Sequence, residues 1–139
     1  METKERLMLK YALGGIVLST SLHSAALSLG GYTGQAIIGR PLDMLRFRPN
    51  LVIEGAEAFA EDCWKRILIG DVEFRVVKPC SRCILTTIDP QTGARSEDRE
   101  PLATLQKYRA QADGAMFGQN LVNDANGMLE VGMPVTVLE

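Results

Sequence analysis

Histidine and cysteine, which ligate many transition metals in proteins, are scarce in this sequence. The chain of 139 residues has one histidine, His23, and three cysteines. A histidine-rich metal site is therefore excluded, and any histidine-dependent catalytic triad would have to use His23. An odd number of cysteines does not suit a secreted disulfide framework, which normally pairs an even number. We therefore expect a reducing compartment and a cytoplasmic protein.

The sequence also lacks an excess of positive charge and a long apolar run. Its formal net charge is −2 and its pI is about 5.5, which argues against a general nucleic-acid-binding protein. Lys4, Arg6 and Lys10 precede an apolar stretch that loosely resembles a signal peptide. Polar residues interrupt this stretch, which is too short and too polar to span a bilayer. We expect a buried helix or hairpin there, and neither a nucleic acid nor a membrane as a partner.

Short strand patterns fill most of the chain. Hydrophobic residues make up 46% of it, enough for the core of a single domain over residues 1–139. A strand is predicted at residues 51–54, and Gly70-Asp71 suits the turn of a hairpin in which Val72, Phe74 and Val76 share one face. Further strands are predicted after Cys83 and in the C-terminal segment, with loops and turns between them.

Helical patterns are fewer. Residues 2–12 fit a short helix, and Pro101 is well placed as the first residue of a second helix with Leu102, Leu105 and Tyr108 on its apolar stripe. Trp64 is expected in the core, and Cys63 is expected to serve packing. The pattern predicts a mainly β fold, a closed or partly open β-barrel with one or two short helices.

The stretch "VVKPCSRCILTTIDP" holds Cys80 and Cys83 and carries the most chemical information. A zinc site would need a second pair of ligands, which the sequence does not supply. A thioredoxin-like couple would need a helix after the motif, whereas the following residues resemble a strand. A single functional thiolate at Cys80 fits the positive charge of Lys78 and Arg82, with Cys83 as a small packed hydrophobe. Burial of both cysteines without a function stays open.

Several stretches together resemble the C-terminal part of the MOSC domain (molybdenum-cofactor sulfurase C-terminal domain) family. They are "RFRPNLVIEG", "EDCWKRILIGDVEFRVVKPCSRCILTTIDPQTG", "EPLATLQKYR", "FGQN" and "VGMPVTVL". Within that family, the resemblance is closest to molybdenum enzymes such as the amidoxime-reducing components. It covers residues 40–139 and leaves residues 1–39 atypical. It implies a Greek-key barrel similar to that of pyruvate kinase.

The resemblance also implies a site. The family's ligating cysteine corresponds to Cys80, which would bind molybdenum and be the catalytic residue. A pterin cofactor of the molybdopterin type would contact residues of three of the matching stretches: Arg46, Arg48, Asn50, Lys78, Ser81, Gln119 and Asn120. The "FGQN" residues are expected in a connecting loop. No lysine lies in a Schiff-base motif, so pyridoxal phosphate, which the family has also been associated with, is not expected.

Three functions remain open at this point. The first is an oxidoreductase that reduces N-hydroxylated or related N-oxygenated small molecules and takes electrons from a flavin or iron–sulfur protein. The second is a non-catalytic carrier of sulfur or cofactor, with Cys80 as the carrying thiol. The third is a degenerate domain that keeps the barrel and binds no cofactor.

Overall fold

Strands dominate the parts of the chain that the computed structural model describes, which are residues 8–12, 17–18, 23–25 and 42–139. The strands are β1 (Met8–Ala12), β2 (Val17–Leu18), β3 (His23–Ala25), β4 (Leu51–Glu54), β5 (Arg66–Ile69), β6 (Val72–Arg82), β7 (Ala110–Gln111), β8 (Gly114–Asn123), β9 (Gly127–Met128) and β10 (Val135–Val137). Single 3₁₀ turns form η1 (Met44–Phe47), η2 (Ala60–Cys63) and η3 (Ile84–Thr87), and α2 (Leu102–Tyr108) is an α-helix.

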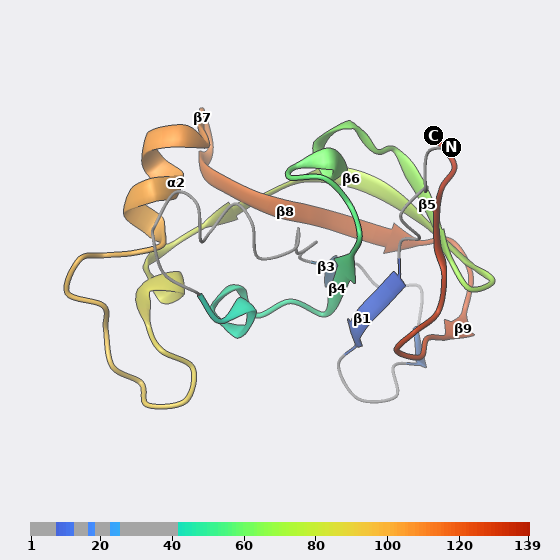
Figure 1. The fold of residues 1–139 in the computed structure, drawn as a ribbon. Helices are drawn as coiled ribbons and strands as arrows, with labels where there is room; N and C mark the ends of the chain where they lie inside the picture. Colours follow the sequence, from blue (N-terminus) through green and yellow to red (C-terminus); the bar gives the residue numbers. More distant parts are fainter. Residues whose placement is uncertain (1–7, 13–16, 19–22, 26–41) are drawn as a thin grey trace, which may run out of the picture.

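The main sheet is built on two long antiparallel strands, β6 and β8, which run side by side through the molecule (Figure 1). Its strand order is β10-β5-β6-β8-β3, and β7 pairs with one end of β8. Two small sheets, β1-β4 and β2-β9, accompany it. Among the described strands the main sheet does not close on itself. The predicted mainly β class with short helices is confirmed, in the form of an open sheet.

The main core lies on one face of this sheet and confirms the predicted hairpin. Gly70, with a φ of 56°, and Asp71 form the turn between β5 and β6. Val72 and Phe74 are buried, whereas Arg75 on the other face is exposed. Trp64 packs partly buried against the same core, as expected. The buried cluster comprises Leu51, Ile53, Ile67, Ile69, Val72, Phe74, Leu121, Leu129 and Val135.

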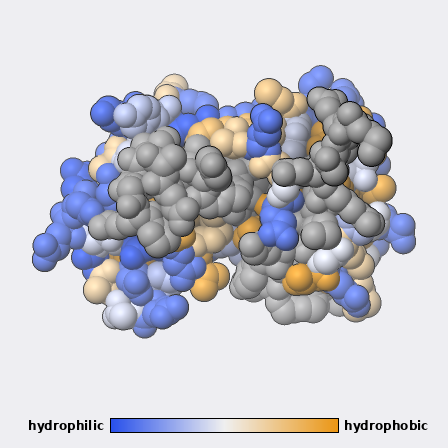
Figure 2. Space-filling model, viewed as in Figure 1, coloured by the Kyte–Doolittle hydropathy of each residue, from blue (hydrophilic) through white to orange (hydrophobic). Residues whose placement is uncertain are grey.

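A second, smaller core lies under α2, at one end of the molecule. It contains Phe47, Leu102, Leu105 and Ala115, so α2 buries the first two residues of its predicted stripe. Tyr108 is 57% exposed and does not belong to that stripe. Much of the visible surface at this end is hydrophilic (Figure 2).

The helix predicted for residues 2–12 is wrong over residues 8–12. These residues form β1, which pairs antiparallel with β4 from Met8 opposite Glu54 to Ala12 opposite Leu51. The good helix formers in this segment supply only a weak local preference, and pairing with a buried strand overrides it. Within the apolar stretch for which a helix or hairpin is expected, Val17 and Leu18 form β2 and residues 23–25 form β3, and the rest of the stretch lies outside the described residues.

Gly127 of β9 lies where the structure leaves no room for a side chain. A Cβ atom there would overlap Cγ2 of Val72, which is 4% exposed in the main core. We expect Gly127→Ala to lower the free energy of unfolding by about 1–3 kcal/mol, because Val72 must move in a packed core. Urea unfolding would measure this change. In a Val72→Ala background the added cost should largely disappear, and an equal cost in both backgrounds would contradict the steric explanation.

Candidate functional site

The segment that carries the two cysteines departs from regular pairing. β6 pairs evenly with β8 from Phe74 to Val76, and its register then shifts between Val76 and Lys78 and again between Pro79 and Ser81. Cys80 lies in the second irregularity, and its residue is half-buried. An extra residue in one strand of a pair bends that strand and redirects the side chains around it. The fold therefore places Cys80 at an irregularity of the pairing between β6 and β8, where residue 80 lies opposite residues 117 and 118.

Cys83 is not the packed strand residue that the sequence pattern predicted. β6 ends at Arg82, and Cys83 is exposed and precedes η3. The Thr86 hydroxyl donates to the Cys83 carbonyl at 3.0 Å, and the Thr87 hydroxyl donates to the Ile84 carbonyl at 2.7 Å. These bonds let β-branched residues, which were interpreted as a strand, close a helical turn instead. The packing role predicted for Cys83 is therefore wrong.

None of the chain's three cysteines, all of which the structure describes, forms a disulfide. Cys63 is exposed on η2, so the packing role predicted for it is also wrong. Among the described residues, no group of three or more His, Cys, Asp or Glu side chains is placed to hold a metal ion. A metal bound at Cys80 or Cys83 would accordingly need further ligands other than the described His, Cys, Asp and Glu side chains.

Arg82 lies between the two cysteines in the sequence, and its side chain connects β6 with β8 and with η1. Its Nε donates to the Phe117 carbonyl at 2.7 Å, and its Nη1 donates to the Phe47 carbonyl at 2.9 Å. The guanidinium also lies over the Phe47 ring, 5.5 Å from the ring centroid. Through these contacts one side chain of β6 holds both β8 and the end of η1.

The remaining nitrogen of Arg82 has chemical consequences. Nη2 is buried and has no hydrogen-bond partner within the described part of the chain. Burial lowers the pKa of Arg82, and attraction to the thiolate forms of Cys80 and Cys83 opposes that lowering. The site thus combines a half-buried cation, a buried N–H donor without a partner among the described residues, and two cysteines next to that cation in the sequence.

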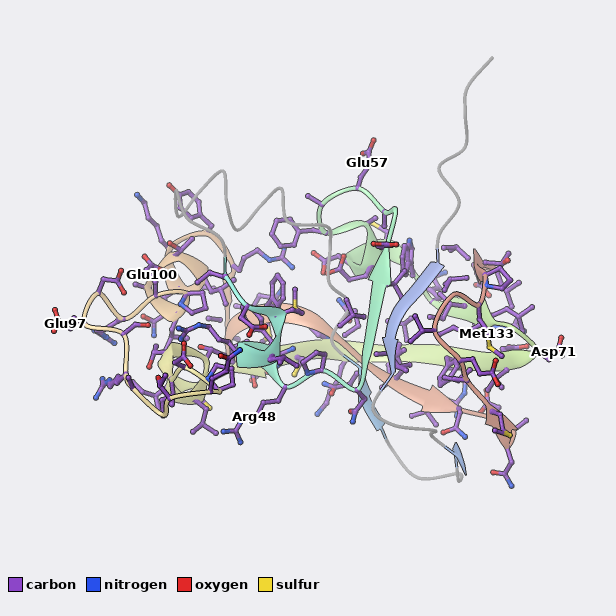
Figure 3. The ribbon with its side chains drawn as sticks, turned by 60° about the horizontal axis from the view of Figure 1, so that its bottom comes forward. Arg48, Glu57, Asp71, Glu97, Glu100 and Met133 are labelled. Atoms are coloured by element: carbon purple, nitrogen blue, oxygen red, sulfur yellow. The ribbon has the colours of Figure 1, made fainter. Side chains whose placement is uncertain are left out.

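The residues expected to bind a cofactor phosphate lie on and after η1. Asp43 caps this turn by accepting a bond from the Leu45 N–H at 2.9 Å. Arg46 is only 13% exposed and donates to Asp89 and to Ser96, each at 3.4 Å. Arg48 ends η1 in a left-handed conformation, with a φ of 50°. Its side chain is exposed and projects away from the ribbon (Figure 3), so of the two arginines Arg48 is the one open to a ligand.

The "FGQN" residues lie inside β8, so the prediction of a connecting loop is wrong. Neighbouring residues of a strand point to opposite faces, and this separates the two amides. Gln119 is 3% exposed and donates to Oδ1 of Asp62 at 3.0 Å. Asn120 is opposite Lys78 on β6, and its Nδ2 donates to the Pro79 carbonyl at 3.4 Å. Lys78, Ser81 and Asn120 therefore remain beside the cysteine segment, whereas the Gln119 amide is used inside the fold.

A cavity of about 580 Å³ opens between η1 and the turn that follows η3. Glu97 lies at the outer end of that turn (Figure 3). The cavity is lined by Leu42, Asp43, Arg46, Asp89, Ser96, Glu97 and Asp98, and by neither Cys80 nor Cys83. The fold therefore places Arg46 at this cavity, whereas Cys80 on β6 and Cys83 just after it are not among the residues that line the cavity.

Sequence reasoning missed a polar network around η2. Asp62 accepts a bond from Nη2 of Arg109 at 2.6 Å and from Gln119, while Arg109 stacks 4.1 Å from the centroid of the Phe59 ring. Next to Asp62, the carboxyl group of Glu61 is completely buried. The sequence offers no sign of this arrangement, because acidic residues in a polar stretch are usually exposed.

Known proteins resemble this chain at the level of sequence and of fold. It matches the family model described as "MOSC domain" over residues 21–136. Mitochondrial amidoxime-reducing component 1 of Homo sapiens is 50% identical over 101 residues, which are 66% of this chain and 29% of that protein. The component 1 of Mus musculus is 44% identical over 71% of this chain and 31% of its own length. The chain thus spans about three-tenths of the curated relatives it matches.

A solved structure supports the fold. YiiM from Geobacillus stearothermophilus superimposes with a TM-score of 0.56 at 20% identity, over 83% of this chain and 54% of that one. The structure also contains, among its described residues, no helix long and apolar enough to cross a membrane. Because the family model matches residues 21–136, most of its length, the chain belongs to the MOSC domain family.

Proposed function

We propose that this chain binds a molybdenum cofactor through a thiolate of the segment around Arg82 and supports the reduction of N-hydroxylated or related N-oxygenated small molecules. The observation that carries the proposal is the half-buried Arg82, whose buried Nη2 has no hydrogen-bond partner among the described residues and which lies between Cys80 and Cys83 in the sequence. A soft thiolate suits a molybdenum centre, and a guanidinium suits an anionic group attached to it. The names of the amidoxime-reducing relatives supply the substrate class.

Cys80 is the predicted thiolate ligand, and the structure makes Cys83 a second candidate. Cys80 is half-buried at an irregularity of the β6–β8 pairing, whereas Cys83 is exposed and directly precedes η3. Arg82 follows one cysteine by two residues and precedes the other, and the charge of each thiolate acts on it. Both cysteines therefore flank the same guanidinium group in the sequence.

The other predicted contacts divide into two groups. Arg48, Asn50, Lys78, Ser81 and Asn120 are exposed or half-buried and are the residues that would hold the pterin and its phosphate. Arg46 and Gln119 are engaged by Asp89 and Asp62, so each would first have to exchange its partner.

When bound, such a cofactor supplies a metal that changes oxidation state as an oxygen leaves the substrate, with electrons provided by a flavin or iron–sulfur protein. The chain's own residues would bind and orient it: a thiolate ligates the metal, and Arg82 keeps a positive charge beside that thiolate. The exposed thiol of Cys83 favours a second candidate function, a carrier of sulfur or cofactor, because a carrying thiol must reach a partner.

Metal content tests the proposal. Protein produced in a host that makes molybdenum cofactor should carry molybdenum and pterin in equal amounts. Cys80→Ser should lose the bound molybdenum and keep its circular dichroism spectrum, because the thiol contributes ligation and not packing. Cys63→Ser is the matched control and should retain the metal, since Cys63 lies on η2 outside the segment. Loss only in Cys83→Ser would transfer the ligand role to Cys83, and well-folded wild-type protein without molybdenum would overturn the proposal.

A further inference from the structure

Glu61 is a buried carboxyl group without a visible structural use. Its side chain is 0% exposed, and neither carboxylate oxygen has a hydrogen-bond partner among the described residues. An ionised carboxylate is disfavoured in such a place, because burial removes its hydration and the described residues supply no hydrogen bond of good geometry in exchange. The folded structure therefore favours the protonated form of Glu61 over its ionised form.

Two described ionisable groups act on Glu61. Asp62, on the same turn, repels a negative charge at this place, and Arg109, which follows α2, attracts it. β8 also packs against η2, and no residue of β8 is ionisable. Arg109 is already bound to Asp62 at 2.6 Å and stacked on Phe59. An ionised Glu61 would have to compete with Asp62 for the same cation.

Glu61 lies on η2, a short turn that packs against β8. η2 has four residues, and Phe59, which precedes it, has a left-handed φ of 61° that costs energy in a residue other than glycine. Asp62 joins it to β8 by accepting the bond from Gln119. Displacing a single turn exposes far less apolar surface than unfolding the sheet, so η2 can be displaced while the sheet stays folded.

We propose that Glu61 is a proton-controlled latch. While Glu61 is protonated, η2 stays packed against β8. When Glu61 ionises, η2 moves away from β8 and the contact between Asp62 and Gln119 breaks. The latch does not depend on the proposed cofactor. Burial, assisted by repulsion from Asp62 and opposed by the Glu61 backbone N–H and by Arg109, raises the pKa of Glu61 to about 7. The change would thus occur near neutral pH.

The chain contains a natural reporter for this change. Trp64 is the only tryptophan, and it follows η2 directly with its backbone N–H donating to the Glu61 carbonyl at 3.2 Å. Its ring packs partly buried against the main core. Unseating η2 should expose this ring to water and shift its emission to longer wavelength.

Tryptophan emission of the full chain between pH 5.5 and 8.5 tests the latch. We expect a one-proton red shift with a midpoint near 7 in the wild type, and no such transition in Glu61→Gln, which keeps the low-pH emission. His23→Gln is the control, because histidine also titrates near this pH, and it should keep the full transition.

Two results would overturn the latch: a wild-type emission that stays constant across this range, or a transition of the same midpoint in Glu61→Gln. If the glutamine variant does not fold, Glu61→Met provides a second side chain of similar length that cannot ionise. NMR of the Gln119 side-chain amide gives an independent readout. Its proton exchange should accelerate above the midpoint in the wild type beyond the acceleration seen in Glu61→Met, and equal acceleration in both proteins would refute the release of Gln119.

Discussion

The stability advantage of Glu61→Gln over the wild type should grow by about 3 kcal/mol between pH 4.5 and pH 8. Burial raises the pKa of Glu61 from its ordinary 4.5 to about 7 in the folded protein. Each pKa unit corresponds to about 1.4 kcal/mol of difference between the two protonation states. The glutamine variant carries no such proton, so the difference between the two proteins isolates this one group.

The sign follows from proton binding. Between 4.5 and about 7 the folded protein holds the Glu61 proton more tightly than the unfolded chain does. The stability of the wild type therefore falls as the pH rises through this range and becomes level above it. Urea unfolding at pH 4.5, 6 and 8 would measure the effect. A constant difference between the two proteins at all three values would show that Glu61 is ionised or solvated in the folded state.

Arg82→Ala should lower the free energy of unfolding by about 2–5 kcal/mol. The substitution leaves the Phe47 and Phe117 carbonyls without their donor, and an unsatisfied buried group costs about 1–3 kcal/mol. It also removes the stacking of the guanidinium on Phe47. Thermal or urea unfolding measures the loss.

Arg75→Ala is the matched control for this prediction, because it makes the same substitution on the same strand. Arg75 is exposed and forms an ion pair with Asp124 at 2.8 Å. Exposed ion pairs contribute little, so Arg75→Ala should be far milder than Arg82→Ala. Comparable losses in the two variants would mean that Arg82 acts through general charge rather than through its buried bonds.

The sequence was most informative where a local turn or strand signal coincides with the apolar residues that form the core. The hairpin around Gly70 and Asp71 combines a turn signal with alternating apolar residues, and both are visible in the chain. The strand at Leu51–Glu54 and the helix after Pro101 were equally accessible. In each of these cases the residue types that favour the element also form the core.

It was least informative where a hydrogen bond to a side chain or a distant strand determines the structure. The turn at Ile84–Thr87 depends on threonine hydroxyls that bond backward, and strand β1 depends on β4 for its partner. The burial of Gln119 and Glu61 depends on which turn packs against β8. No periodicity within the chain records such contacts, so the site's polar network required the structure.

The order of strands has a consequence for how the chain acquires its structure. β3, at residues 23–25, pairs with residues 119–121 of β8, and β2 pairs with β9 near the C-terminus. These early strands leave the ribosome long before their partners exist. Sheets that depend on pairing between strands far apart in the sequence fold slowly, in roughly milliseconds to seconds. Until the pairing forms, the edges of their strands stay exposed. We expect refolding to be limited by the arrival of the C-terminal strands, and the nascent chain to need protection from aggregation until then.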